Sequence, residues 1–264
     1  MLDNTTLIRS AVLIAIAIFS LAGCGGSKIL KEPKPMEHQG LLAAESHGTL
    51  AVVLEWVIVR DGPGTWSKNA DWDEYLFRVH NVSSSDVTIE SVVIYDSLET
   101  MVVSGADRKQ LIKGSKAASK RYETEGLEVK AGLGAAGLAA SGAAAYVGGS
   151  YLAVATLTGA AGTGAGTAVV ALGAAFVAAP ALLVGGMIRG SNNNSVGQEI
   201  ANRQTSLPLR LSAGEEVPLD LFFPLSPSPV KVEINYSDAA GSHVLILDTK
   251  AALDGLHLRE SKSE

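Results

Sequence analysis

The sequence predicts an α+β fold, in which an antiparallel β-sandwich is interrupted by a long glycine- and alanine-rich α-helical hairpin. Two groups of four β-type segments predict the sandwich, one within residues 48–105 and the other within residues 205–252. Between them, the 58 residues 131–188 carry no formal charge and hold 13 of the 28 glycines. Because neither β group alone would bury much apolar surface, we interpret them as one domain with an insertion. Two separate small β units are the alternative.

The first 23 residues have the layout of a cleaved signal peptide. A short polar start with Arg9 precedes an apolar run over residues 11–19, and small residues follow it. A helix that spans a bilayer needs about 20 apolar residues, and this run is shorter. We therefore expect residues 1–23 to direct export and to be removed.

The residues Leu21, Ala22, Gly23 and Cys24 resemble the lipobox of bacterial lipoproteins. The resemblance implies that Cys24 is diacylated, becomes the new N-terminus and is usually N-acylated. Gly25 in place of Asp implies transfer to the outer membrane. Cys24 is also the only cysteine, so lipidation supplies a use for it and no disulfide forms within the chain. An ordinary signal peptide with an incidental cysteine is the alternative.

The expected elements follow in order along the chain. Residues 24–47 lack periodicity and predict a flexible tether. Alternation and branched residues predict eight strands, at 50–59, 75–80, 87–95, 100–103, 207–211, 217–223, 230–236 and 243–247. Residues 191–204 are expected to be a short connector and 253–264 a polar tail. Eight short strands with turns between them suggest an immunoglobulin-like sandwich.

The insertion spans residues 106–190, and its first part is predicted to be a basic helix. Residues 106–121 hold six bases and one acid: Arg108, Lys109, Lys113, Lys116, Lys120 and Arg121, with Asp107. Basic side chains beside an apolar segment can contact anionic headgroups, at about 1 kcal/mol per charge. A solvated helix face is the alternative.

The uncharged stretch predicts two helices, residues 131–157 and 168–188, joined by a glycine-rich turn. At 1.5 Å per residue they would measure about 40 and 31 Å, which matches a bilayer. Small residues recur on neighbouring turns and would let helices pack closely in lipid: Gly134, Gly137, Ser141, Ala145, Gly149, Gly162 and Gly166. The stretch resembles glycine-zipper segments of bacterial envelope lipoproteins, which implies close helix packing and membrane association. A soluble hairpin packed on the sandwich is the alternative.

No motif predicts catalysis, a cofactor or a metal site. The five histidines are dispersed without zinc-ligand spacing, and the carboxylates of residues 71–74 lack the rest of a calcium loop. A net charge of −6 argues against a nucleic-acid partner. Trp56 is expected in the core, whereas Trp66 and Trp72 fit either the core or a binding edge.

These patterns lead us to expect a non-enzymatic, lipid-anchored protein on the periplasmic face of the outer membrane. Its partners would be the bilayer, through the acyl chains on Cys24 and through the hairpin, and other copies of itself. The alternative is a lipid-tethered adaptor that binds another envelope protein through the sandwich.

Overall fold

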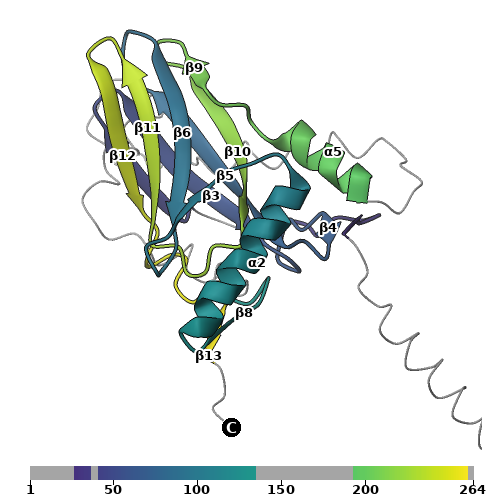
Figure 1. The fold of residues 1–264 in the computed structure, drawn as a ribbon. Helices are drawn as coiled ribbons and strands as arrows, with labels where there is room; N and C mark the ends of the chain where they lie inside the picture. The colour runs from purple at the N-terminus through teal and green to yellow at the C-terminus, as the bar shows by residue number, and fades with distance from the viewer. Residues whose placement is uncertain (1–26, 37–40, 135–192, 261–264) are drawn as a thin grey trace, which may run out of the picture.

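The computed structural model describes residues 27–36, 41–134 and 193–260, which form a β-rich α+β fold (Figure 1). Two antiparallel sheets and two helices account for most of it. The strands of the two larger sheets are β2 (Ala43–His47), β3 (Leu50–Ile58), β5 (Trp72–Asn81), β6 (Val87–Tyr95), β7 (Met101–Val103), β9 (Leu209–Leu211), β10 (Glu216–Pro224), β11 (Lys231–Asp238) and β12 (Gly241–Asp248). The remaining elements are β1 (Lys28–Ile29), β4 (Ser67–Lys68), β8 (Leu127–Val129), β13 (Leu258–Glu260), α2 (Arg108–Thr124) and α5 (Asn193–Arg203).

Strands from both sides of the insertion alternate within each large sheet. The four-stranded sheet has the order β10-β5-β3-β2, and the five-stranded sheet has the order β12-β11-β6-β7 with β9 on β6. β10 therefore pairs with β5, and β11 pairs with β6, across the insertion. The two β groups form one unit, and the alternative of two separate β units is wrong.

The main core takes side chains from both large sheets, which form two layers in Figure 1. Period-two alternation explains the choice of side chains. On β5, Tyr75, Phe77 and Val79 are fully buried in this core, and on β10 Leu219 and Leu221 are buried beside them. Trp56 is 1% exposed, as expected for a core residue.

All eight predicted strands are present, but the segments predicted as irregular contain further structure. Residues 43–47, expected in the tether, form β2 and pair with β3. The expected connector contains α5. In the expected polar tail, Leu253, Leu256 and His257 are buried, and β13 pairs with β8. β2 and β13 are too short to show periodicity, so tertiary contacts define them, whereas α5 has 11 residues and its buried Val196 and Ile200 recur at a four-residue spacing.

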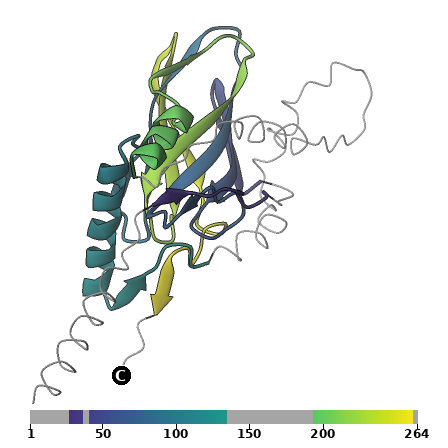
Figure 2. The ribbon, with the colours of Figure 1, turned by 90° about the vertical axis from the view of Figure 1, so that its right-hand side faces the viewer.

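The basic helix predicted over residues 106–121 is confirmed as α2, which continues to Thr124. Asp107 caps it, because its carboxylate accepts the backbone N–H groups of Lys109 and Gln110. The helix buries side chains that recur at three- and four-residue spacing on one face: Leu111, Ser115, Ala118 and Tyr122. Figure 2 shows α2 lying along the outside of the sheets.

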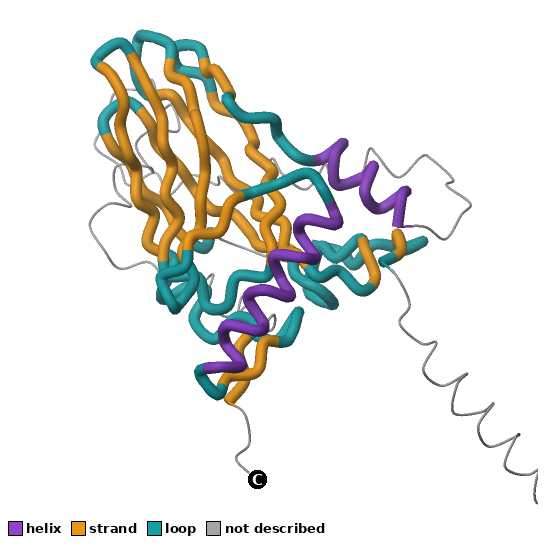
Figure 3. Tube along the Cα trace, viewed as in Figure 1, coloured by secondary structure: helices purple, strands orange, loops and turns teal. Residues whose placement is uncertain are grey.

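Helix α5 packs a second, smaller core against the four-stranded sheet. Val196 and Ile200 of α5 contact a cluster that includes Leu111 of α2 and Phe222 of β10. The two helices that flank the insertion therefore share one apolar cluster, and both lie outside the strand layers in Figure 3.

Candidate functional site

The described residues that adjoin the predicted functional features belong to α2, α5 and the strand pairs β1–β4 and β8–β13. We call these elements together the helical end. In Figure 1, α5 and β4 lie near the first turn of α2, and β8 and β13 lie at its other end. The described chain starts there at Ser27, stops at Gly134 and resumes at Asn193. The insertion therefore leaves and re-enters the fold at the helical end.

The start of the described chain is fixed by specific contacts. Ser27 is 5% exposed. Its hydroxyl accepts from Nη2 of Arg108 at 3.1 Å and donates to the Asn69 carbonyl at 3.3 Å. The next residues, β1, pair with β4, and the Leu30 N–H donates to the Trp66 carbonyl at 2.8 Å. The tether predicted over residues 24–47 is therefore wrong over 27–30 and 43–47, because these residues pair with folded segments.

The segment that leads into the insertion is held by a buried histidine. His257 Nε2 lies 2.8 Å from Oδ2 of Asp73, and the Gly132 N–H donates to His257 Nδ1 at 3.2 Å. Because Nδ1 accepts, the ring proton is on Nε2 and is donated to Asp73. Gly132 has φ +78°, and a Cβ there would lie 2.1 Å from the Arg60 carbonyl oxygen, so only glycine fits. These contacts tie residues 127–134 to the C-terminal segment.

The six predicted membrane-surface bases divide into two groups. Lys109, Lys113, Lys116 and Lys120 are exposed and recur along the outer face of α2. The other two are engaged within the fold. Arg108 bonds Ser27, and Arg121 Nη2 lies 3.0 Å from Oδ2 of the fully buried Asp96.

Only one of the predicted helix-packing residues lies within the described chain. Gly134 has φ +81°, and residues 131–134 form a turn, so the expectation that a helix begins at residue 131 is wrong. A Cβ on Gly134 would lie 3.1 Å from the Gly255 carbonyl oxygen, so its close approach is to another loop. The other predicted residues lie outside the described part: Gly137, Ser141, Ala145, Gly149, Gly162, Gly166 and the lipobox residues Leu21, Ala22, Gly23 and Cys24.

A buried ion pair lies beneath α5. Glu74 is 2% exposed, and its Oε2 accepts from Trp66 Nε1 at 2.6 Å. Its Oε1 lies 3.5 Å from Nη1 of Arg203, whose guanidinium lies over the Trp66 ring at 4.8 Å. Burial raises the pKa of Glu74, and Arg203 and the Trp66 N–H partly offset this rise. The last turn of α5 is thus fixed to β5.

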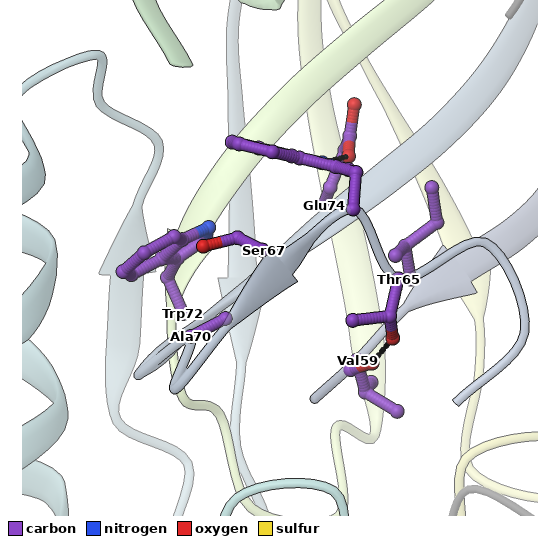
Figure 4. Close-up of a pocket in the computed structure, with 8 residues that line it drawn as sticks. Val59, Thr65, Ser67, Ala70, Trp72 and Glu74 are labelled. Carbon is purple, nitrogen blue, oxygen red and sulfur yellow. Dashed lines mark hydrogen bonds between the residues drawn. The ribbon is translucent and has the colours of Figure 1, made fainter. Parts of the chain in front are cut away.

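A small recess, with room for about one water molecule, adjoins this pair. Its lining includes Trp66, Trp72 and Glu74. Figure 4 shows Trp72, Ser67 and Glu74 around it, with the Thr65 hydroxyl bonded to the Val59 carbonyl at 2.6 Å. Trp66 and Trp72 are 4% and 2% exposed. They belong to the core, and the binding-edge alternative is wrong for both.

Two more carboxylates on the same sheet, the buried Glu55 and the partly buried Asp220, lack full pairing. Burial raises the pKa of Asp220 to about 7, and the negative charges of Glu74 and Glu55 add to this rise. Oδ1 of Asp220 is buried and has no hydrogen-bond partner among the described residues. Burial also raises the pKa of Glu55, although Arg78 Nε donates to it at 2.7 Å.

At the opposite end of the sheets, two histidines surround Tyr236. The Tyr236 hydroxyl donates to the His47 carbonyl at 2.6 Å and lies 3.0 Å from His47 Nδ1. His243 Nε2 lies 2.9 Å from Oδ1 of Asp238. Hydrogen bonds from His243 and Thr49 lower the pKa of Asp238 to about 2. This network ties β2 to β11.

The described residues offer no site for a metal ion, since no three His, Cys, Asp or Glu side chains converge among them. The carboxylates of residues 71–74 bind separate partners: Asp71 pairs with Arg60, Asp73 with His257 and Glu74 with Arg203. The three carboxylates therefore do not converge on one point. No helix in the described ranges has both the length and the hydropathy needed to cross a bilayer.

Sequence reasoning missed the buried polar residues that organise this end. His257 was placed in a polar tail, and no local pattern indicated its contact with Asp73, 184 positions away. The Asp73-Glu74 pair beside the apolar run of the strand was the available signal, because buried acids in strands need partners. Comparison of the chain with family models, with curated proteins and with solved structures finds no match.

Proposed function

We propose that the chain is a non-enzymatic outer-membrane lipoprotein, anchored through Cys24, whose immunoglobulin-like β-sandwich presents a membrane-associating or self-assembling glycine-rich hairpin. The observation that carries the proposal is the pairing of a lipobox-like Leu21 to Cys24 with 58 uncharged residues in one chain. The lipid on Cys24 and the uncharged stretch would both be explained if each contacts a membrane.

The geometry of the helical end supports this proposal. The chain emerges at Ser27, three residues after Cys24, beside α5, which contacts β1. α5 begins where the described chain resumes after the insertion, and residues 127–134 are the last described residues within it before that point. The proposed lipid anchor therefore joins the body beside α5, which begins where the chain re-enters the fold. A membrane on that side can receive the anchor without any rearrangement of the sheets.

The rigid fixing of the insertion's two ends supports a presenting role for the body. On one side, β8 pairs with β13 beside the His257–Asp73 contact. On the other, α5 is held by its apolar cluster and by the ion pair of Arg203 with Glu74. Because both ends of the insertion are fixed, the folded body determines where the insertion lies relative to its binding partner.

Carbonate extraction of a signal-cleaved Cys24→Ala form tests the membrane association of the hairpin. Without the acyl chains, each of which contributes about 0.8 kcal/mol per buried methylene, retention depends on the protein alone. We expect a substantial fraction to stay in the membrane pellet. Complete release would contradict membrane association by the insertion. A Cys24→Ala form that also lacks residues 135–192 is the matched control, because it keeps both fixed ends.

A lipid-tethered adaptor is the second candidate. Apolar side chains on the five-stranded sheet favour it, since Met101, Val103, Val244 and Ile246 are 45–58% exposed. Such residues can contact another envelope protein. Crosslinking in cells distinguishes the two functions: a single heterologous partner, lost when Val244 and Ile246 are changed to Thr, favours the adaptor. Crosslinks between copies at Gly137 and Gly149 favour the self-assembling hairpin.

A further inference from the structure

The distance between the proposed lipid and the folded body is short. Ser27 is buried and bonded to Arg108 and to the Asn69 carbonyl. Only three residue steps separate it from Cys24, and three steps extend at most about 11 Å. A lipid on Cys24 would therefore hold the β1–β4 pair within about one Debye length of the headgroups, whose negative potential decays over that distance.

The surface around Ser27 is basic. Lys28 of β1 and Lys68 of β4 are exposed and stand directly opposite each other in the strand register. Like charges in this arrangement repel each other and destabilise the pair. Lys109 in the first turn of α2 is also exposed, and it follows Arg108, which bonds Ser27. An anionic partner would relieve this repulsion.

Nearby acids do not neutralise these lysines. Asp107 caps α2 through its carboxylate, Asp71 pairs with Arg60, and Glu199 pairs with Arg203. Within the described ranges, no carboxylate lies within 4.0 Å of the ammonium group of Lys28, Lys68 or Lys109, the distance that defines an ion pair. The three charges are therefore available to an external anion.

We propose that β1, β4 and the first turn of α2 form a membrane-facing surface that rests on anionic phospholipid headgroups through Lys28, Lys68 and Lys109. The proposal rests on the proposed function, because the lipid on Cys24 brings this surface to the bilayer. It assigns the first turn of α2, rather than its whole basic face, to the membrane. Lys120 lies eleven residues beyond Lys109, about 16 Å further along the helix.

Binding to vesicles separates the two ends of α2. The probe is the unlipidated chain 24–264 with Cys24→Ala, sedimented at low salt with vesicles of phosphatidylcholine containing roughly a third phosphatidylglycerol. One variant carries Lys28→Gln, Lys68→Gln and Lys109→Gln. The matched control carries Lys116→Gln, Lys120→Gln and Lys130→Gln, which removes three exposed charges from the far end. All forms keep the insertion, so its contribution cancels in the comparison.

The first variant should bind about a hundredfold more weakly than the parent, at roughly fivefold per charge near the surface. The control should lose less than tenfold, and neutral vesicles should abolish the difference between the forms. Equal losses in the two variants, or no loss in the first, would overturn the proposal. Thermal melting of each variant shows that the fold is intact, since these side chains are exposed.

Failure of this surface and failure of the proposed function give different results. The vesicle comparison uses a chain without lipid, so its outcome does not depend on whether Cys24 is acylated. If the first variant binds weakly but the natural chain has an unmodified Cys24, the surface stands and the lipoprotein proposal fails. If Cys24 is acylated but the two variants bind equally, the lipoprotein proposal stands and the surface is wrong.

Discussion

His257 Nε2 donates to Oδ2 of Asp73 at 2.8 Å, and neither side chain has any exposed surface. The bond joins the C-terminal segment to the start of β5. Through its Nδ1, His257 also accepts from Gly132 at the start of the insertion. One imidazole thus fixes three segments that are distant in the chain.

Replacing His257 should therefore destabilise the whole fold. His257→Ala leaves the Asp73 carboxylate buried without its donor, which costs about 3 kcal/mol. Urea unfolding should show this loss, and the double variant with Asp73→Ala should lose less than the sum of the two single changes. The control is His80→Ala on the partly exposed face of β5. Equal effects of His257→Ala and His80→Ala would contradict this account.

Two helical glycines should respond in opposite directions to alanine. A Cβ on Gly114 would lie 2.6 Å from Cγ of Pro224, whereas a Cβ on Gly197 would lie 3.9 Å from Cβ of Arg108. Gly114→Ala forces α2 away from β10 and should cost about 1–3 kcal/mol. Gly197→Ala has room and should stabilise α5 by up to about 1 kcal/mol. Thermal melting of both variants checks the signs, and a stabilised Gly114→Ala protein would show that α2 is not held by this contact.

Asp220 should make stability fall as the pH rises. Its carboxyl has a pKa of about 7 in the folded protein, above the ordinary 3.8. Between these values the folded protein keeps a proton that the unfolded chain has lost, so this stability is complete below about pH 4 and is lost towards pH 7. Asp238, with a pKa of about 2, titrates below this range.

The Asp220→Asn variant isolates this effect, because an amide resembles the protonated carboxyl. Its advantage over the natural chain should grow by about 2 kcal/mol from pH 4.5 to pH 8, less than the full shift gives because Asp220 is only partly buried. Urea unfolding at the two pH values measures it. Glu123→Gln on the exposed face of α2 is the control and should show no such growth. A constant difference for Asp220→Asn would refute the raised pKa.

Replacing Arg203 should lower the free energy of unfolding, because the buried Glu74 loses its ion-pair partner. Arg203→Ala leaves a 2% exposed carboxylate with only the Trp66 N–H as a partner among the described residues. We expect a loss of about 3 kcal/mol. Adding Glu74→Gln should recover part of that loss, since the neutral amide can still accept from Trp66. If the second change instead deepens the loss, the ion pair is not what holds α5.

The strands were predictable because they bury apolar side chains at a simple period. Tyr75, Phe77 and Val79 alternate along β5, and all three are buried in the observed core. Likewise, the basic helix predicted over residues 106–121 begins near its observed start. Local patterns of this kind depend on neighbouring residues alone, so one sequence is enough to detect them.

The helical end was less predictable because long-range contacts define it. β1 has two residues, and nothing local distinguishes them from a tether. Its place depends on Arg108, 81 positions from Ser27. Similarly, Arg121 looked like any other base of α2, but its charge is used by the buried Asp96. Burial of a polar group depends on partners that the local sequence does not identify.

The central claim is that Cys24 carries a membrane anchor, and the intact mass of the chain purified from membranes tests it most directly. We expect a chain that begins at Cys24, heavier than residues 24–264 by a diacylglyceryl group and an amide-linked acyl chain. The Cys24→Ala form should lack both additions. A membrane-derived chain with an unmodified Cys24, or one that begins at another residue, would contradict the claim.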